Sequence, residues 1–417
     1  MSNSATPVLQ NERTDILDVL RGFALVGVLL DNVFGFSGWS FLTQQHREAL
    51  ATWPVDGIIG LSELTFINGK FYSLLSLLFG IGFSIILIRN ELKGINPLKI
   101  FYRRLFILLL IGLGHLLLLW EGDILVLYAL IGMLLPLFRK CKDNTLLIWA
   151  GVLILSPILI DIVNVLLKVK TGNFLEAIAQ GIDKKNGIPT DDSFAAYLYK
   201  DGSGWQEWRN WQASGFLYRY AYIIESNRIP KVLGMFLIGL YAGRKMIYTN
   251  LANYTSLFKK LRRWGFIIGI PAAIACTYFE LFGKKIPDIS GLGHTVFYAL
   301  SVVPLCLAYT AVICLHWIKK GGNTKLKLLA PVGRMAMTNY LMQTFIGITL
   351  YYGVGFGLGG NIGPAIFIPV GLCVYLLQII YSNWWFKHFN YGPFEWVWRQ
   401  LSYGKRLPLK KQQPPVS

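Results

Sequence analysis

Charged residues are scarce in this chain. Lysine, arginine, aspartate and glutamate make up 15% of its 417 residues, whereas 54% are hydrophobic, and the mean hydropathy is +0.48. Apolar stretches of about 20 residues recur along the sequence, and this length is needed to cross ~30 Å of hydrocarbon. The composition therefore excludes an ordinary soluble domain and predicts an integral membrane protein.

Cysteine is also rare, and no cleavable leader is recognisable. Four of the five cysteines fall in apolar runs and one in a basic loop, so their spacing predicts neither a disulfide framework nor a metal site. The first 14 residues lack the charged start and the cleavage site of a secretory signal. The first apolar run is therefore expected to stay in the protein.

What the chain does contain is a series of long apolar runs. Run length predicts about ten transmembrane helices and no strands, which is an all-α membrane bundle. The expected spans are 16–36, 68–88, 102–120, 122–138, 145–167, 229–247, 263–282, 292–317, 334–353 and 363–386.

The net charge of +18 is concentrated in alternate loops between these runs. Most lysines and arginines fall in four segments, 89–104, 139–142, 244–263 and 319–334, and in the tail after residue 386. This distribution is typical of topology determinants rather than of a nucleic-acid surface, so no nucleic acid partner is predicted. The positive-inside rule then predicts that both termini lie in the cytoplasm.

One long connection interrupts the series on the predicted outer side. We divide the chain into an N-terminal membrane half (1–167), an outer insertion (168–228), a C-terminal membrane half (229–400) and a cytoplasmic tail (401–417). The insertion is rich in aromatic residues, which favours an amphipathic helix on the outer headgroups. A lid or a sugar-binding surface is the alternative. The insertion contains Trp205, Trp208, Trp211, Phe216, Tyr218, Tyr220 and Tyr222.

The most informative polar residues lie in the apolar stretch 107–132. His115, Trp120, Glu121 and Asp123 interrupt it within nine residues. Charged groups at membrane depth are costly and usually face a cavity or a partner. A neutral histidine held by a carboxylate is suited to act as a general base, because its ordinary pKa is ~6.5. The alternative is a wet loop with a packing histidine.

Several other polar residues share the predicted depth of His115. Asp31 and Asn32 end the first span, Lys70 begins the second, and His294 begins the eighth. Together they predict a cavity that opens to the outside. For Asp31 and Lys70, snorkelling to the membrane surface is the alternative.

A second polar group is predicted at the inner side. Asp18 and Arg21 can pair one helical turn apart. Asn339 and Gln343 share one helix face above Arg334, so these residues could bind an anionic cofactor or line a polar tunnel. Hydrogen bonding between helices is an equal alternative for the two amides.

Five motifs in order along the chain resemble the YeiB-like family of bacterial inner-membrane proteins. They occupy residues 18–32, 70–80, 114–125, 333–343 and 391–399. The first half of that family is similar to the membrane acyltransferase superfamily, which includes the lysosomal heparan-α-glucosaminide N-acetyltransferase. The resemblance implies that acetyl-CoA or another acyl-CoA is bound from the cytoplasm and that its acyl group passes to an acceptor on the far side.

The resemblance departs at one position. Arg21 and Asn32 have the spacing of the Arg-x10-His motif of related acyltransferase-3 proteins, but the histidine is replaced by Asn32, and an amide cannot act as a general base. The lysosomal enzyme places its functional histidine in the loop after the first span, where His46 stands here. His115, within the family-like Gly-His segment, is the leading candidate.

The first hypothesis is therefore a transmembrane O- or N-acyltransferase that acts on a sugar or envelope glycan. His115 is the predicted base, oriented by Asp123 or Glu121, and Asn32 and Lys70 bind the carbonyl or the acceptor. The predicted binding residues are Asp18, Arg21, Lys70, Trp120, Arg334, Asn339, Tyr340 and Gln343. A transporter or permease for a small polar or anionic solute is the second hypothesis, and a sensor or structural partner the third. Homodimers are compatible with all three, and no metal is predicted.

Overall fold

Helices form the whole regular structure of the described residues. The computed structural model describes residues 14–191, 193–200 and 204–411. The prediction of an all-α fold is confirmed in these segments. The helices are α1 (Asp15–Phe36), η2 (Trp39–Phe41), α2 (Gln44–Glu48), α3 (Val55–Phe66), α4 (Lys70–Glu91), α5 (Pro97–Leu118), α6 (Leu125–Gly132), η3 (Leu135–Phe138), α7 (Asp143–Leu167), α8 (Asn173–Asn186), α9 (Phe194–Tyr199), α10 (Trp205–Glu225), α11 (Arg228–Arg244), η4 (Leu251–Tyr254), α12 (Thr255–Phe282), α13 (Ile289–Lys319), η5 (Lys325–Leu329), α14 (Ala330–Arg334), α15 (Ala336–Tyr351), α16 (Pro364–His388) and α17 (Pro393–Tyr403).

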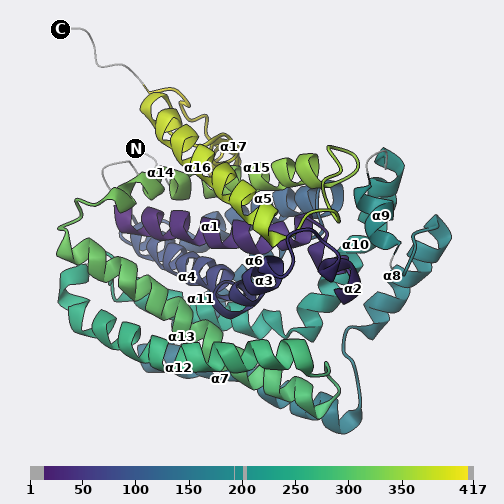
Figure 1. Ribbon diagram of the computed structural model, residues 1–417. Helices are drawn as coiled ribbons and strands as arrows, with labels where there is room; N and C mark the ends of the chain where they lie inside the picture. Colours follow the sequence, from purple (N-terminus) through teal and green to yellow (C-terminus); the bar gives the residue numbers. More distant parts are fainter. Residues whose placement is uncertain (1–13, 192, 201–203, 412–417) are drawn as a thin grey trace.

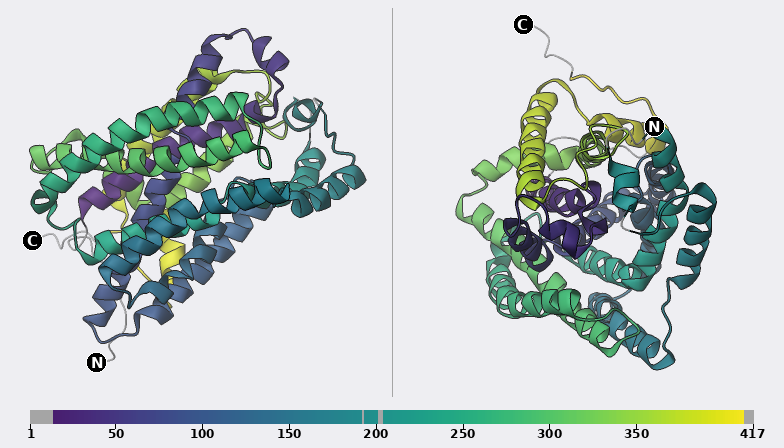
Figure 2. Two further views of the ribbon diagram at one scale, coloured as in Figure 1. Left: turned by 90° about the horizontal axis from the view of Figure 1, so that it is seen from below. Right: turned by 45° about the vertical axis from the view of Figure 1, so that its right-hand side comes forward.

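The long helices run side by side, and this gives the bundle two ends. The insertion helices α8, α9 and α10 lie at one end and the start of α1 lies at the other (Figure 1). We call these the outer end and the inner end, as the loop charges predict. The antiparallel pair α12 and α13 packs along its whole length (Figure 2).

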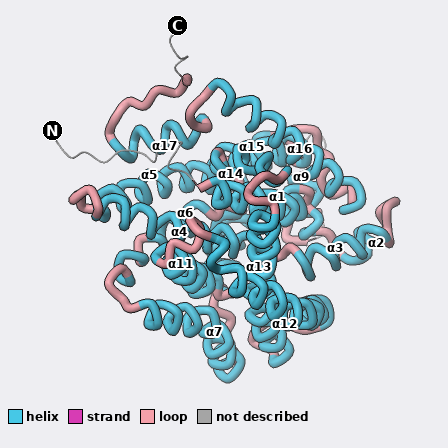
Figure 3. Tube along the Cα trace, turned by 90° about the vertical axis from the view of Figure 1, so that its left-hand side faces the viewer, coloured by secondary structure: helices cyan, strands magenta, loops and turns pink. Residues whose placement is uncertain are grey.

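Central and peripheral helices differ in what they expose. Seen from the inner end, α1, α4 and α11 lie in the middle, and α7 and α12 lie at the periphery (Figure 3). An outward face of aliphatic side chains is expected where a helix meets lipid rather than water. The exposed apolar residues of α7 include Leu147, Ile148, Val152, Leu155, Leu159, Val163 and Leu166.

Two glycines allow the central helices to touch through their backbones. A Cβ atom at Gly80 on α4 would collide with the carbonyl oxygen of Phe236 on α11, and one at Gly239 would collide with that of Leu77. Small residues at helix contacts permit this close approach in membrane bundles. The α4–α11 contact therefore fixes the middle of the bundle.

The predicted number of spans needs one correction. Seven helical segments of the described residues are long and apolar enough to cross a membrane. The other three predicted spans coincide with α6, α11 and α15, which have only 8, 17 and 16 residues. Apolar run length overestimates them because the loops beside α6 and α15 are apolar too. The Pro-rich end of the predicted tail, 412–417, lies outside the described residues.

Two outer segments also differ from the predictions. The stretch before Lys70, expected as a loop, contains the apolar helix α3, which packs on α12 and α16. In the insertion, α10 rests partly on protein rather than only on headgroups. Its Trp211 is buried against Phe194 and Tyr218, and Gln212 donates a hydrogen bond to the carbonyl of Leu119. Trp205, by contrast, is exposed as predicted.

Candidate functional site

His115 and Asp123 lie together where α5 meets α6. His115 is in the last turn of α5, and its Nδ1 is 2.8 Å from Oδ2 of Asp123. The other carboxylate oxygen of Asp123 accepts a hydrogen bond from the backbone N–H of Val126 at the start of α6. Asp123 thus caps one helix and holds the histidine of the other. Both side chains are only 1% exposed.

A third residue completes a line of hydrogen bonds, which we call the His115 network (Asp123, His115 and Thr344). Nε2 of His115 is 2.9 Å from the hydroxyl of Thr344 on α15. Because a carboxylate only accepts, Nδ1–H donates to Asp123, while Nε2 faces the Thr344 hydroxyl, which is also within 3.4 Å of the Tyr340 carbonyl. The ring of Tyr340, one turn earlier on α15, lies 5.2 Å from the imidazole. The fold therefore directs Nδ1 of His115 at a carboxylate and Nε2 at a hydroxyl.

Trp120 and Glu121 lie beside this network but have separate surroundings. Trp120 is buried against the ring of Phe36 at 4.1 Å. Oε2 of Glu121 is buried without a hydrogen-bond partner among the described residues. Burial raises the pKa of this carboxyl to about 6, although Arg219 nearby favours its ionised form. Asp123, not Glu121, is therefore the carboxylate that orients His115.

Asn32 and Lys70 are not joined to the His115 network by any hydrogen bond within the described segments. Lys70 is 3% exposed, and its ammonium group donates to the carbonyl of Leu64. Asp31 accepts a hydrogen bond from Asn68. The Lys70 side chain is thus buried in the protein rather than snorkelling to the membrane surface. The residues predicted at one outer depth therefore lie at two separate sites, the His115 network and the surroundings of Lys70.

At the inner end, Asp18 and Arg21 form the predicted ion pair. Nη1 of Arg21 is 2.6 Å from the Asp18 carboxylate, and the arginine side chain remains 30% exposed. The backbone of α14 lies directly against α1, because a Cβ at Gly333 would collide with the carbonyl of Asp18. The guanidinium of Arg334 stacks on the ring of Phe386 at 4.1 Å.

Asn339 and Gln343 form hydrogen bonds between helices. The amide of Asn339 donates to Ser382, and the amide of Gln343 donates to Gln378, which in turn donates to the carbonyl of Asn339. All four side chains are buried. We call these four residues the amide ladder. This geometry favours the structural alternative over a cofactor site.

The last helix contributes to the same region. Glu395 on α17 accepts hydrogen bonds from the backbone N–H groups of Met337 and Thr338 and from the Thr338 hydroxyl. These groups belong to the first turn of α15 and would otherwise have no partner. Glu395 is therefore the cap of the helix that carries Thr344.

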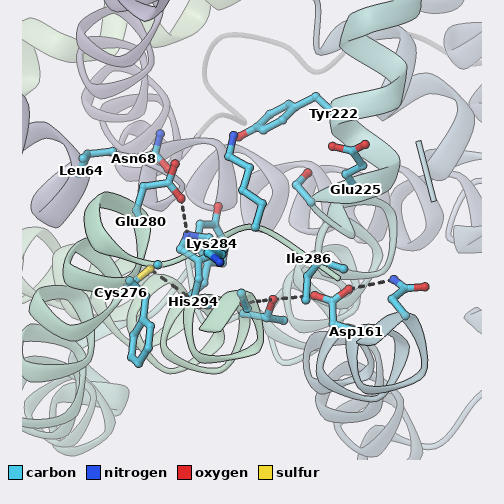
Figure 4. Close-up of a pocket in the computed structure, with 18 of the residues that line it drawn as sticks. Leu64, Asn68, Asp161, Tyr222, Glu225, Cys276, Glu280, Lys284, Ile286 and His294 are labelled. Carbon is cyan, nitrogen blue, oxygen red and sulfur yellow. Dashed lines mark hydrogen bonds and ion pairs between the residues drawn. The ribbon is translucent and has the colours of Figure 1, made fainter. Parts of the chain in front are cut away.

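A polar cavity of about 190 Å³ lies at the outer end, between α4, α7, α11, α12 and α13 (Figure 4). We call it the outer cavity. Lys70 and His294, which the sequence singled out, line it, and Tyr222 and Glu225 of α10 border it. The charged residues in its wall are Lys70, Asp161, Lys170, Glu225, Lys231, Glu280, Lys284, Lys285 and His294.

Several residues of both regions escaped the sequence reasoning. Asp161 and Lys231 interrupt apolar runs in the same way as His115, so the cost of charge in the membrane could have identified them. Thr344 and Gln378 carry no such signal, because neutral polar residues are common in membrane helices. Only the packing of α15 against α5 and α16 reveals them.

The fold and these polar regions define an all-α protein of membrane type, with buried polar side chains between helices that could cross a bilayer. The chain belongs to the YeiB-like family, as its motifs indicated. It is 32% identical to "Uncharacterized protein YxaH" of Bacillus subtilis (strain 168), over 98% of this chain and 99% of that protein. It is 27% identical to "Uncharacterized protein YeiB" of Escherichia coli (strain K12), over 94% and 96%.

Two further comparisons agree with this membership. The family described as "Protein of unknown function (DUF418)" matches residues 242–405. An "Uncharacterized 39.9 kDa protein in amylase 3'region" of Bacillus acidopullulyticus is 27% identical over 97% of this chain and 99% of that protein. No solved structure is significantly similar to the chain.

Proposed function

We propose that this protein is a transmembrane acyltransferase of the bacterial inner membrane. It moves an acyl group, in the simplest case acetyl, from acyl-CoA on the cytoplasmic side to a sugar or glycan on the outer side. One observation carries the proposal: His115 is held by Asp123 with its Nε2 directed at a hydroxyl oxygen 2.9 Å away. This is the arrangement that a general base for a hydroxyl requires.

In the proposed reaction, Nε2 of His115 takes the proton from the acceptor hydroxyl or amine. The acceptor oxygen or nitrogen then forms a bond to the thioester carbonyl carbon, and the carbon–sulfur bond breaks. The thiolate of CoA leaves and receives the proton from the imidazolium. The Asp123 carboxylate keeps the ring in the required tautomer and stabilises its charged form between these two steps.

The acceptor must reach a buried base. Because Nε2 is already bonded to Thr344, the acceptor hydroxyl takes the place of the threonine hydroxyl in the reactive complex. The Tyr340 ring, 5.2 Å from the imidazole, forms one wall of that position. Thr344 is thus a positioning residue that keeps Nε2 satisfied until the acceptor arrives.

Fewer residues are proposed to bind the acyl donor than the sequence predicted. The amide N–H groups of Asn339 and Gln343 are already used in the amide ladder, so the proposal does not assign them to the CoA site. The Arg21 side chain is 30% exposed at the inner end, close to the α14 segment that carries Arg334. These two arginines remain the proposed contacts for the phosphate groups of the donor.

Labelled acetyl-CoA and a panel of glycans test the proposal on the purified full-length protein. We expect transfer by the parent and by His46→Gln, since His46 is exposed on α2, and loss of transfer by His115→Gln. Transfer that is unaffected by His115→Gln would remove the proposed base. Chromatographic behaviour and thermal stability of both variants control for misfolding.

The transporter hypothesis retains one observation in its favour, the outer cavity with its charged wall. A permease needs a polar site of this kind among its spanning helices. Uptake of a small anion by proteoliposomes without any thioester would favour this second function. Label transferred to a glycan, without uptake, would favour the first.

A further inference from the structure

The outer cavity contains three carboxylates, and each one already has a partner. Asp161 accepts hydrogen bonds from the amides of Asn164 and Asn227 and from the hydroxyl of Thr295, at 2.6 to 3.2 Å. The Glu280 carboxylate lies 3.3 Å from His294, on the left of Figure 4. The partners of Asp161 are uncharged and leave its negative charge uncompensated, but the five lysines of the wall outnumber its three carboxylates.

The third carboxylate, Glu225, is used in the same way. Its Oε1 is 3.1 Å from the ammonium group of Lys170, which also pairs with Glu176 at 2.6 Å. Lys170 is therefore shared between two acids at the edge of the outer cavity. The remaining lysines of the wall must be satisfied by something else.

Lys231 on α11 has no carboxylate within 4.0 Å among the described residues. Its ammonium nitrogen lies 4.1 Å from the centre of the Tyr298 ring and makes no hydrogen bond in the described part of the chain. A partly buried ammonium group that lacks both a carboxylate and an acceptor is costly. The aromatic ring compensates for part of that cost but offers no lone pair.

Lys70 provides a second ammonium group in the same wall. It donates to the Leu64 carbonyl, and its other two N–H bonds meet no acceptor within the described segments. Asp31 and Glu63 lie near it, beyond ion-pair distance, and Asp31 is engaged by Asn68. Lys284 and Lys285, both exposed, add positive charge at the mouth.

We infer that the outer cavity binds a phosphate group, with Lys231 and Lys70 as its anchors. Phosphate oxygens accept several charge-assisted hydrogen bonds, which these ammonium groups can donate. At ~30 Å³ for each water, a cavity of this volume holds about six waters. The volume therefore suits a phosphate group with a short organic substituent inside the cavity.

The source of the phosphate group is either a lipid headgroup or a soluble phosphate ester. Exposed apolar side chains border the mouth, among them Leu281 and Phe282 at the end of α12 and Ile289 at the start of α13. A lipid headgroup can therefore enter from the bilayer, as a solute can enter from the water. The inference does not depend on acyl transfer.

Two binding measurements on the full-length protein test this site. Glycerol 3-phosphate is titrated calorimetrically into the protein in neutral detergent. Retention of phosphatidylglycerol is measured by native mass spectrometry after release from nanodiscs. We expect saturable binding of at least one probe, weakened about tenfold to a hundredfold by Lys231→Met and largely kept by Lys231→Arg. Lys260→Met, an exposed lysine of α12 outside the outer cavity, is the matched control.

Each outcome has a consequence. Binding of glycerol 3-phosphate without lipid retention identifies a soluble ester, and the reverse identifies a headgroup. Equal binding by Lys231→Met and Lys260→Met, or binding of neither probe by the parent, overturns the site. If Lys231→Met does not fold, Lys70→Met serves in its place with the same expectation. Because no thioester is present, these results stand apart from any failure of acyl transfer.

Discussion

Polar side chains are buried in two parts of this molecule, and the two parts satisfy them differently. In the His115 network and the amide ladder, each N–H donor named above meets an acceptor of the same protein, although the side-chain oxygens of Asn339 and Gln343 have no donor among the described residues. In the outer cavity each carboxylate accepts a hydrogen bond or forms an ion pair, but Lys231 has no hydrogen-bond acceptor in the described residues. The first pattern holds helices together, whereas the second requires a molecule from outside.

The two parts should therefore differ in whether a substitution lowers or raises the stability of the protein. Removing one member of a matched network leaves its partner unsatisfied, so stability should fall. Removing an unmatched cation relieves a desolvation cost, so stability should hold or rise. The following five predictions sharpen this comparison.

The largest effect should come from Asp123→Asn on acyl transfer. An asparagine keeps the shape but no longer enforces the Nδ1–H tautomer of His115, so transfer should fall by about 10²- to 10⁴-fold. Rates with labelled acetyl-CoA measure it, with the exposed Asp191→Asn as control. If the Asp123→Asn variant keeps the full rate of transfer, the His115 network has a structural role only.

Next in size is the effect of Glu395→Ala on stability. Two backbone N–H groups and one hydroxyl at the start of α15 lose their acceptor, which should cost about 1–3 kcal/mol. Val397→Ala, on the same helix but 42% exposed, should cost much less. Thermal unfolding in detergent compares the two, and equal melting temperatures would show that Glu395 is dispensable.

A smaller loss is expected within the amide ladder. Gln343→Leu and Gln378→Leu should each destabilise by about 0.6–1.7 kcal/mol, the range of single hydrogen bonds between membrane helices. The double variant should lose less than the sum, because neither amide is then left alone. Strict additivity in a double-mutant cycle would mean that the two amides do not interact.

A substitution of Lys231 in the outer cavity should have the opposite effect on thermal stability. Without ligand, Lys231→Met should unfold at the same temperature as the parent or higher, because it replaces an unmatched ammonium group with an apolar side chain. Thermal unfolding in phosphate-free buffer measures it. A large loss of stability would show that Lys231 makes stabilising contacts, as the residues of the amide ladder do.

The last prediction concerns pH and Glu121. Burial raises the pKa of this carboxyl from its usual 4.5 to about 6 in the folded protein. The folded state therefore binds the proton more tightly than the unfolded state, and stability falls as pH rises between 4.5 and 6. Glu121→Gln should gain melting temperature relative to the parent above pH 6 but not below pH 4.5. A difference that is independent of pH would contradict this sign.

Sequence reasoning recovered local features better than distant ones. The pairing of His115 with Asp123 follows from a short spacing around one helix end, and the shared face of Asn339 and Gln343 follows from helical periodicity. What those faces meet depends on how α5, α15 and α16 pack, and no pattern within one helix specifies it. Thr344 and Gln378 became visible only through that packing.

The residues of the outer cavity could be predicted only in part, for the same reason. His294 and Lys70 were singled out, but as part of one stratum with His115, because depth in the membrane was the only coordinate that the sequence supplied. Helices of equal depth can lie on opposite sides of a bundle. Asp161 and Lys231 belong to the cavity because α7 and α11 face α12 and α13 there, which hydropathy does not encode.

The capping of α15 by Glu395 also has a consequence for biosynthesis. The backbone N–H of Thr338 and the carboxylate that receives it are 57 residues apart in the chain. During translation, α15 is therefore complete before the acceptor of its first turn has been made. The first turn of the helix that carries Thr344 stays uncapped until Glu395 has been added, so a chain that stops before this residue should expose the start of α15 to proteases.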